Sequence, residues 1–259
     1  LFKPYFDELG FSIPERPKDL GAKFEEQIEA IFAVRPAVFS FVYGIPSSDI
    51  LEKCRTLGIK TAGAATTVDE AVELEKAGVD AVVATGFEAG GHRVSFLKSA
   101  EDSLSGTFSL IPQVADNIKI PVIAAGGIAD SRGIKAAFAL GADAVQMGTA
   151  FLATTQSNAA QDHKDKLFST DAKYTTLTKV FTGRLSRGLR NRLTEELKNY
   201  ESLLAPYPLQ GKFMSFLKAY PPTANSNPDF KSFWAGQSAP LLKHKDAKVL
   251  IETLVNEMN

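Results

Sequence analysis

The segment EAGGHR, residues 88–93, places an imidazole in a glycine-rich loop directly after an apolar run that is typical of a strand. An unperturbed imidazole titrates near neutrality, so His92 can take or give a proton at the end of that strand. Gly90 and Gly91 precede it, and glycine allows the backbone to approach a ligand closely. The pattern predicts a catalytic role for His92; the alternative is a histidine that only bonds the loop backbone.

Two further strand-then-glycine segments follow, at residues 122–127 and 144–148. Gly126 and Gly127 stand between a strand and the start of a helix, where exposed backbone N–H groups suit an anion. Gly148 repeats the arrangement after the next strand, and the residue that follows it, Thr149, adds a hydroxyl donor. Either segment alone is explained by a tight turn. Together, in consecutive units, they indicate the phosphate site that parallel β/α barrels carry at their mouth.

These residues need a scaffold that brings the ends of several strands together. Five short apolar runs predict strands buried on both faces, and four patterns with helical spacing lie between them. The alternation of strand and helix predicts an α/β fold of the (β/α)8 barrel type, with about five βα units present and an open parallel sheet as the alternative. The predicted strands are residues 37–42, 59–63, 81–85, 121–125 and 144–147, and the predicted helices are residues 47–57, 67–77, 108–118 and 131–140.

The character of the sequence changes after residue 155. Residues 156–205 are charged and have helical spacing, turn-rich segments follow, and residues 246–258 predict a closing amphipathic helix. We therefore expect two parts. Residues 1–155 form the partial barrel, and residues 156–259 form a helical appendage that covers the barrel mouth.

Several other polar residues carry weaker signals. Glu88 is equally suited to orienting the neighbouring histidine, binding a ligand hydroxyl or bonding the loop backbone. The arginines of GRLSRGLRNR, residues 183–192, favour an exposed basic face of an amphipathic helix over an anion site. His163 and His244 are predicted to lie on the surface. Trp234 is either buried packing or a lid over a ligand.

The composition excludes some classes of function. The 259 residues carry a formal net charge of −1 at pH 7, which gives no reason to expect nucleic acid or a membrane surface as a partner. Cys54 is the single cysteine, so an internal disulfide is excluded and a reducing, cytoplasmic setting is expected. The sequence has no metal-ligand spacing, so no metal is expected. It also has no GxGxxG motif, so a Rossmann dinucleotide site is not expected. The oligomeric state is left open, a homo-oligomer included.

The segments EAGGHR, PVIAAGGIADSRGIKAAFALGADAVQMGTAFL and PYPLQ…FWAGQ resemble the nitronate monooxygenase family, formerly called 2-nitropropane dioxygenases. The resemblance extends over essentially the whole chain. It implies a TIM barrel with FMN at the C-terminal mouth and a smaller helical part over it. It also implies an enzyme that oxidises alkyl nitronates, with nitroalkanes left open, using FMN as a one-electron relay and O₂ as the electron acceptor.

By the same resemblance, His92 would be the active-site base or the group that binds the substrate. The family often has glutamine at the position of Thr85 and glycine at the position of Val94. The first difference removes an expected hydrogen bond to the flavin ring and the second reshapes the pocket, so the substrate preference stays open. The residues implied to contact FMN are Thr85, Gly90, Gly126, Gly127, Gln146, Met147, Gly148 and Thr149.

Two alternatives remain at this point. Flavin-dependent enoyl-ACP reductases and NADH:quinone reductases share the EAGGH and AAGGI motifs, so an FMN-dependent NAD(P)H reductase is the first. Family members also begin with three more barrel strands, including a QAPM-like segment, and we expect about 90 such residues to precede Leu1. A non-catalytic flavin-binding fragment with open strand edges is therefore the second alternative.

Overall fold

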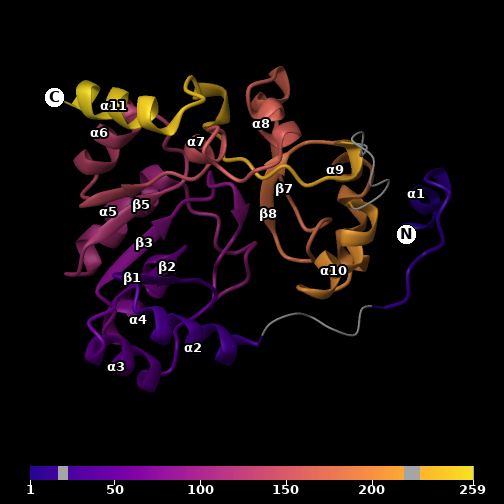
Figure 1. Cartoon of the computed structure of the whole chain (residues 1–259). Helices are drawn as coiled ribbons and strands as arrows, with labels where there is room; N and C mark the ends of the chain where they lie inside the picture. Colours follow the sequence, from indigo (N-terminus) through magenta and orange to yellow (C-terminus); the bar gives the residue numbers. More distant parts are fainter. Residues whose placement is uncertain (17–22, 219–227, 259) are drawn as a thin grey trace.

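A computed structural model describes residues 1–16, 23–218 and 228–258. Its main sheet has five parallel strands in the order β1-β2-β3-β5-β6, so each strand pairs with the next one of this series along the chain (Figure 1). Parallel pairing places all five carboxyl ends at one edge, where the glycine loops begin. The strands are β1 (Val38–Phe41), β2 (Lys60–Ala65), β3 (Ala81–Thr85), β5 (Val122–Ala125) and β6 (Ala144–Gln146).

A helix follows each of the first four of these strands, which gives the βα repeat that the sequence predicts. Side chains cap two of their N-termini: Thr67 Oγ1 accepts from the backbone N–H of Glu70, and Asp130 accepts from those of Arg132 and Gly133. Every strand and helix predicted between residues 37 and 147 is confirmed to within two residues at each end. The helices are α3 (Ser48–Thr56), α4 (Val68–Lys76), α5 (Thr107–Asn117) and α6 (Ser131–Ala139).

The core of this part lies between the sheet and its helices. Leu74 of α4 and Ile111 of α5 are fully buried in one cluster with Val82 of β3 and Val122 of β5. Burying such side chains stabilises the fold by about 1.5–3 kcal/mol each. Two further helices flank the unit, α2 (Phe24–Val34) and α11 (Ala247–Met258). The helix predicted at residues 246–258 is confirmed.

A second, antiparallel sheet in the order β4-β8-β7 joins two strands from the part after residue 155 to a short strand of the His92 loop. Its strands are β4 (Gly91–His92), β7 (Thr175–Thr178) and β8 (Ser186–Leu189). The prediction of helix across residues 156–205 is therefore wrong within β7 and β8. The TTLT run of β7 has the β-branched residues that favour strands.

The arginine-rich segment forms strand β8, so the expected amphipathic helix with a basic face is wrong as well. Arg187 is only 3% exposed, and its Nε donates to the carbonyl oxygen of Phe87 at 2.9 Å. A Cβ on Gly188 would lie 2.8 Å from the carbonyl oxygen of Phe233, so glycine permits a close backbone contact here. The arginines recur at a spacing that would also place them on one face of a helix. Pairing of β8 with β4 and β7 makes the segment a strand instead.

The remaining elements are short. Helix α1 (Lys3–Glu8) lies beside α9 (Arg192–Glu196) and α10 (Leu209–Lys218) in Figure 1. Phe2, Tyr5 and Phe6 are buried in one cluster with Met214 and Phe230. Within the described ranges, no helix has both the length and the apolar character needed to cross a membrane. The other elements are α7 (Thr149–Leu152), α8 (Gln161–Leu167) and 3₁₀ turns at Thr170–Lys173, Lys198–Leu203, Pro228–Phe230 and Ala239–Leu241.

Candidate active site

A cavity of about 350 Å³ opens at the carboxyl ends of the parallel strands. Small apolar side chains of the strands line it, among them Ala64, Val83 and Ala125, and Trp234 faces it from the second part. Met147 does not line the cavity, because its side chain packs with the core between sheet and helices. The predicted site residues that do line it are Thr85, Gly90, His92, Gly126, Gly127, Gln146, Gly148 and Thr149.

The glycine pair after β5 forms one wall of this cavity. Gly126 and Gly127 have φ angles of 100° and 73°, which favour glycine. A Cβ on Gly126 would lie 3.0 Å from the carbonyl oxygen of Gly86 and 3.1 Å from the backbone nitrogen of Ala89. The loops after β3 and β5 therefore touch backbone to backbone, beside the loop that carries His92.

The glycine after β6 has different surroundings. Gly148 has a φ of −96°, and no atom lies within 4 Å of the place where its Cβ would be. Thr149 Oγ1 accepts a hydrogen bond of 2.9 Å from the backbone N–H of Gly236. The threonine predicted to bind a ligand therefore also fastens the Trp234–Gly236 segment to the mouth of the cavity.

His92 is held by main-chain pairing and by a threonine. Strand β4 pairs with β8, so His92 lies opposite Ser186. The imidazole Nε2 lies 3.0 Å from Thr182 Oγ1. The ring is half-buried and lines the cavity. An ionisable group is thus fixed next to the glycine walls, which is the arrangement that proton transfer to or from a bound ligand requires.

Among the residues that the structure describes, three aromatic rings lie around the imidazole. The centroid of His92 lies 6.3 Å from that of Tyr43, 5.5 Å from Tyr207 and 5.7 Å from Trp234. Trp234 also packs edge-on against Phe181, so it is both core packing and a cavity wall. Burial raises the pKa of Tyr43, and Tyr207 adds to this, so its hydroxyl stays protonated. The sequence analysis did not identify either tyrosine. Tyr43 follows strand β1 closely, and Tyr207 lies in the PYPLQ segment.

A buried guanidinium fixes the loop that carries His92. Arg93 is fully buried, and its Nη1 donates to the carbonyl oxygens of Thr85 and Gly86 at 3.1 and 2.8 Å. Its Nη2 donates to the carbonyl oxygen of Ser103 at 2.8 Å, while Nε has no hydrogen-bond partner within the described residues. Burial lowers the pKa of Arg93 to about 10, opposed by two nearby carboxylates. Arg93 therefore remains a cation at neutral pH.

Two glutamates fasten neighbouring loops. Glu70 is fully buried and accepts hydrogen bonds from the backbone N–H groups of Thr66 and Phe96, at 2.7 and 2.5 Å. Glu88 accepts from the backbone N–H of Thr107 at 2.9 Å through each carboxylate oxygen. Of the three interpretations of Glu88, the structure shows bonding to loop backbone. Both carboxylates therefore hold loop backbone in place by accepting its N–H groups.

The prediction of a solvated surface position for His163 is wrong. Its Nε2 lies 2.9 Å from the carbonyl oxygen of Trp234, and its ring packs edge-on against Phe233. Burial lowers the pKa of His163, opposed by the hydrogen bond to Trp234 and by Asp162. A neutral His163 thus anchors the backbone of a residue whose ring contacts His92. His244 is half-buried beside a second cavity, near α6 and α11.

We expect His163→Gln to flatten the pH dependence of stability. Because the pKa of His163 is lower in the folded state, the unfolded chain binds its proton more tightly. Its contribution is therefore complete above the unfolded pKa of about 6.5 and is lost as pH falls below it. The free energy of unfolding in urea should therefore rise less steeply between about pH 5 and pH 7 in the variant than in the wild type. An unchanged slope would contradict this account of His163.

Known proteins are similar to this chain in sequence and in fold over most of its length. The family model for nitronate monooxygenase matches residues 5–257. A probable nitronate monooxygenase from Staphylococcus aureus (strain MSSA476) is 41% identical over 99% of this chain and 72% of the relative. Nitroalkane oxidase from Streptomyces ansochromogenes has a TM-score of 0.91 at 34% identity, covering 99% of this chain and 74% of that one. FabK from Thermotoga maritima has a TM-score of 0.76 at 32% identity, covering 92% and 73%.

Proposed function

The chain belongs to the nitronate monooxygenase family, and we propose that it binds FMN at the strand ends and oxidises alkyl nitronates with O₂. Neutral nitroalkanes are the second substrate class of the proposal. The observation that carries it is the position of His92, which lines the same cavity as the glycine segments after β3, β5 and β6. The choice of FMN, the role of His92 and the use of O₂ are parts of the proposal.

The residues that line the cavity fit a flavin. The wall at Gly126 and Gly127 has no side chains, and the space beyond Gly148 is open, so a flat ring or a phosphate can approach the backbone. When bound, FMN supplies a redox centre that relays single electrons from the nitronate to O₂. We assign the ring to Thr85, Gly90, Gly126 and Gly127, and the phosphate end to Gln146, Gly148, Thr149 and the backbone of Met147.

His92 supplies the proton chemistry in this proposal. With a neutral nitroalkane, the imidazole takes the proton from the carbon that bears the nitro group, and the electron pair of the broken C–H bond remains on the substrate as the nitronate. With a preformed nitronate, no proton has to be removed, and the protonated imidazole donates a hydrogen bond to a nitro oxygen. The two substrate forms therefore depend on His92 to different extents.

The second part of the chain closes the site in this proposal. Tyr207 and Trp234 place aromatic rings over the imidazole, and Thr149 ties Gly236 to the strand end. We propose that residues 156–259 form the cover of residues 1–155 at the cavity. Their apolar faces limit water at the reacting carbon and accept the alkyl chain of the substrate.

We expect Gly148→Ala to weaken FMN binding about tenfold or more, which corresponds to about 1.4 kcal/mol. The added methyl group meets no protein atom within 4 Å, so it projects into the space assigned to the cofactor. Fluorescence titration of the flavin-free protein measures the dissociation constant. Gly211→Ala is the matched control, because its Cβ would make ordinary contacts of 3.9 Å, with the carbonyl oxygen of Phe181 and the Cα of Thr182. Equal affinity in both variants would remove Gly148 from the flavin site.

One comparison favours a second candidate function. The similarity to FabK from Thermotoga maritima at 32% identity, together with the EAGGH and AAGGI motifs, makes an FMN-dependent NAD(P)H reductase the second candidate. Anaerobic stopped-flow mixing separates the two. The proposed function expects an alkyl nitronate to reduce the bound flavin rapidly and NADH to reduce it slowly. The reverse order would transfer the assignment to the reductase.

A further inference from the structure

We propose that Thr182 is a positioning residue that keeps the proton of neutral His92 on Nε2, so that Nδ1 is the nitrogen that accepts the substrate proton. This inference rests on the proposed role of His92 as a base. Thr182 lies in the turn between β7 and β8, about 90 positions along the chain from the imidazole it contacts. No motif connects the two residues.

The direction of the hydrogen bonds around Thr182 carries the inference. Its hydroxyl donates to the carbonyl oxygen of Arg184 at 3.1 Å, and its oxygen accepts from the backbone N–H of Arg184 at 3.4 Å. A hydroxyl has one proton and two lone pairs. We infer that this proton goes to Arg184, so that the contact of 3.0 Å with His92 is made by Nε2–H donating to Oγ1. The lone pair of the neutral ring then lies on Nδ1.

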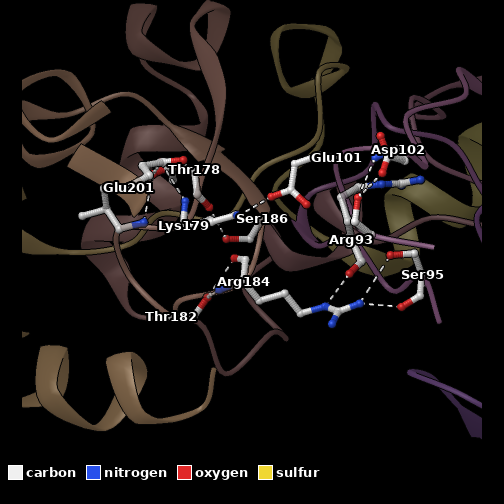
Figure 2. A network of polar contacts seen from close by, with 12 residues as sticks. Arg93, Ser95, Glu101, Asp102, Thr178, Lys179, Thr182, Arg184, Ser186 and Glu201 are labelled. Carbon is white, nitrogen blue, oxygen red and sulfur yellow. Dashed lines mark hydrogen bonds and ion pairs between the residues drawn. The ribbon is translucent and has the colours of Figure 1, made fainter. Parts of the chain in front are cut away.

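The turn that presents Thr182 is fastened to the His92 loop (Figure 2). The Arg184 Nε donates to the carbonyl oxygen of Arg93 at 2.8 Å, and an Nη donates to the carbonyl oxygen of Ser95 at 2.5 Å. The same guanidinium lies over the ring of Tyr43, 4.5 Å from its centroid. Arg184 thus binds the first and third residues after His92, while Thr182 binds the imidazole itself.

The base of the turn is anchored independently. Lys179 forms an ion pair with Glu101, and its backbone N–H donates to Glu201 at 2.8 Å. The hydroxyl of Ser186 donates to the carbonyl oxygen of Thr178 at 3.1 Å. These contacts hold the hydroxyl of Thr182 at a fixed place, so the imidazole is oriented by a rigid acceptor.

The consequence for the proposed reaction is that Nδ1 of His92 takes the substrate proton. When the nitroalkane is deprotonated, its C–H bond breaks, an N–H bond forms at Nδ1, and the electron pair stays on the substrate. The Nε2–H bond to Thr182 persists in the imidazolium. The ring therefore need not rotate between its two protonation states, and Thr182 supports the reacting geometry without touching the substrate.

The test uses NMR of protein labelled with nitrogen-15 in its histidines, in the presence and absence of FMN. The chain has three histidines, so His92→Asn assigns the signal of interest by its disappearance. We expect the His92 proton on Nε2, slowly exchanging with water, in the wild type and in Thr182→Ser, and rapidly exchanging in Thr182→Val. A wild-type proton on Nδ1, or an Nε2–H signal that Thr182→Val leaves unchanged, would overturn the proposal.

Kinetics give a second readout that general loss of structure would not produce. In Thr182→Val we expect kcat for a neutral nitroalkane to fall about tenfold, with a much smaller change for the corresponding nitronate. Thr182→Ser should recover most of the rate. Thr176→Val, which removes a hydroxyl from β7 that bonds only its neighbour's carbonyl, is the matched control. Equal losses for both substrates in Thr182→Val count against the proposal.

The two readouts also separate failures. If neither substrate is oxidised by the wild type, the proposed function fails, and the NMR measurement still decides which nitrogen carries the proton. If the wild type is active and Nδ1 carries the proton, only the inference about Thr182 fails.

Discussion

Replacement of His92 by asparagine is expected to lower kcat/KM for neutral nitroalkanes by about a hundred- to ten-thousand-fold, the usual contribution of a positioned general base. Asparagine can still donate a hydrogen bond toward a nitro oxygen, but it cannot take a proton near neutral pH. The loss for preformed nitronates should therefore be much smaller. Steady-state rates with both forms of one substrate measure the difference.

His244→Asn is the matched control for this substitution. His244 lies beside the second cavity near α6 and α11, outside the candidate site, so both substrate forms should keep their rates. Flavin content must be equal in all samples, because His92 lines the proposed cofactor cavity. Unchanged rates for both substrate forms in His92→Asn would remove His92 from the mechanism.

Gly183→Ala is expected to lower the free energy of unfolding by about 2 to 5 kcal/mol. Gly183 has a φ of 80°, in the region that favours glycine. An added Cβ would collide with the carbonyl oxygen of Ala205 and lie 2.7 Å from the backbone nitrogen of Tyr207. The backbone at 205–207 would have to move, and Tyr207 would leave the imidazole with it. Urea unfolding and the rate with a nitroalkane measure the two consequences.

Gly58→Ala separates backbone strain from the collision. Gly58 has a φ of 72°, and no atom lies within 4 Å of its Cβ position, so its substitution introduces strain without a clash. We expect it to cost only about 1 to 2 kcal/mol and to leave the catalytic rate unchanged. Equal destabilisation in the two variants would show that the contact between the 179–185 turn and residues 205–207 is unimportant.

The parallel sheet was predictable because its signals are local. Each strand is a short apolar run, and the apolar spacing of each following helix is contained within about ten residues. The EAGGHR motif and the glycine segments after β5 and β6 follow directly from these strands. Parallel pairing then brings their ends together, so that eight of the nine predicted site residues line one cavity.

The residues around the imidazole were not predictable in the same way. Tyr43, Thr182 and Tyr207 reach His92 from three separate segments, and only the tertiary arrangement brings them together. Strand β8 was predicted as helix because the arginines of residues 183–192 recur at a spacing that also fits a helix face. In the structure, Gly188 instead allows a close backbone contact with Phe233. Met147 follows β6 in sequence, yet its side chain points into the core. Alternation along a strand end thus limits what a linear motif can assign.

O₂ uptake by the purified, FMN-loaded protein, on addition of an alkyl nitronate without NAD(P)H, tests the central claim most directly. The proposed function predicts rapid uptake that depends on bound FMN. Absence of uptake from protein whose flavin remains bound, together with rapid bleaching of that flavin by NADH, would contradict it.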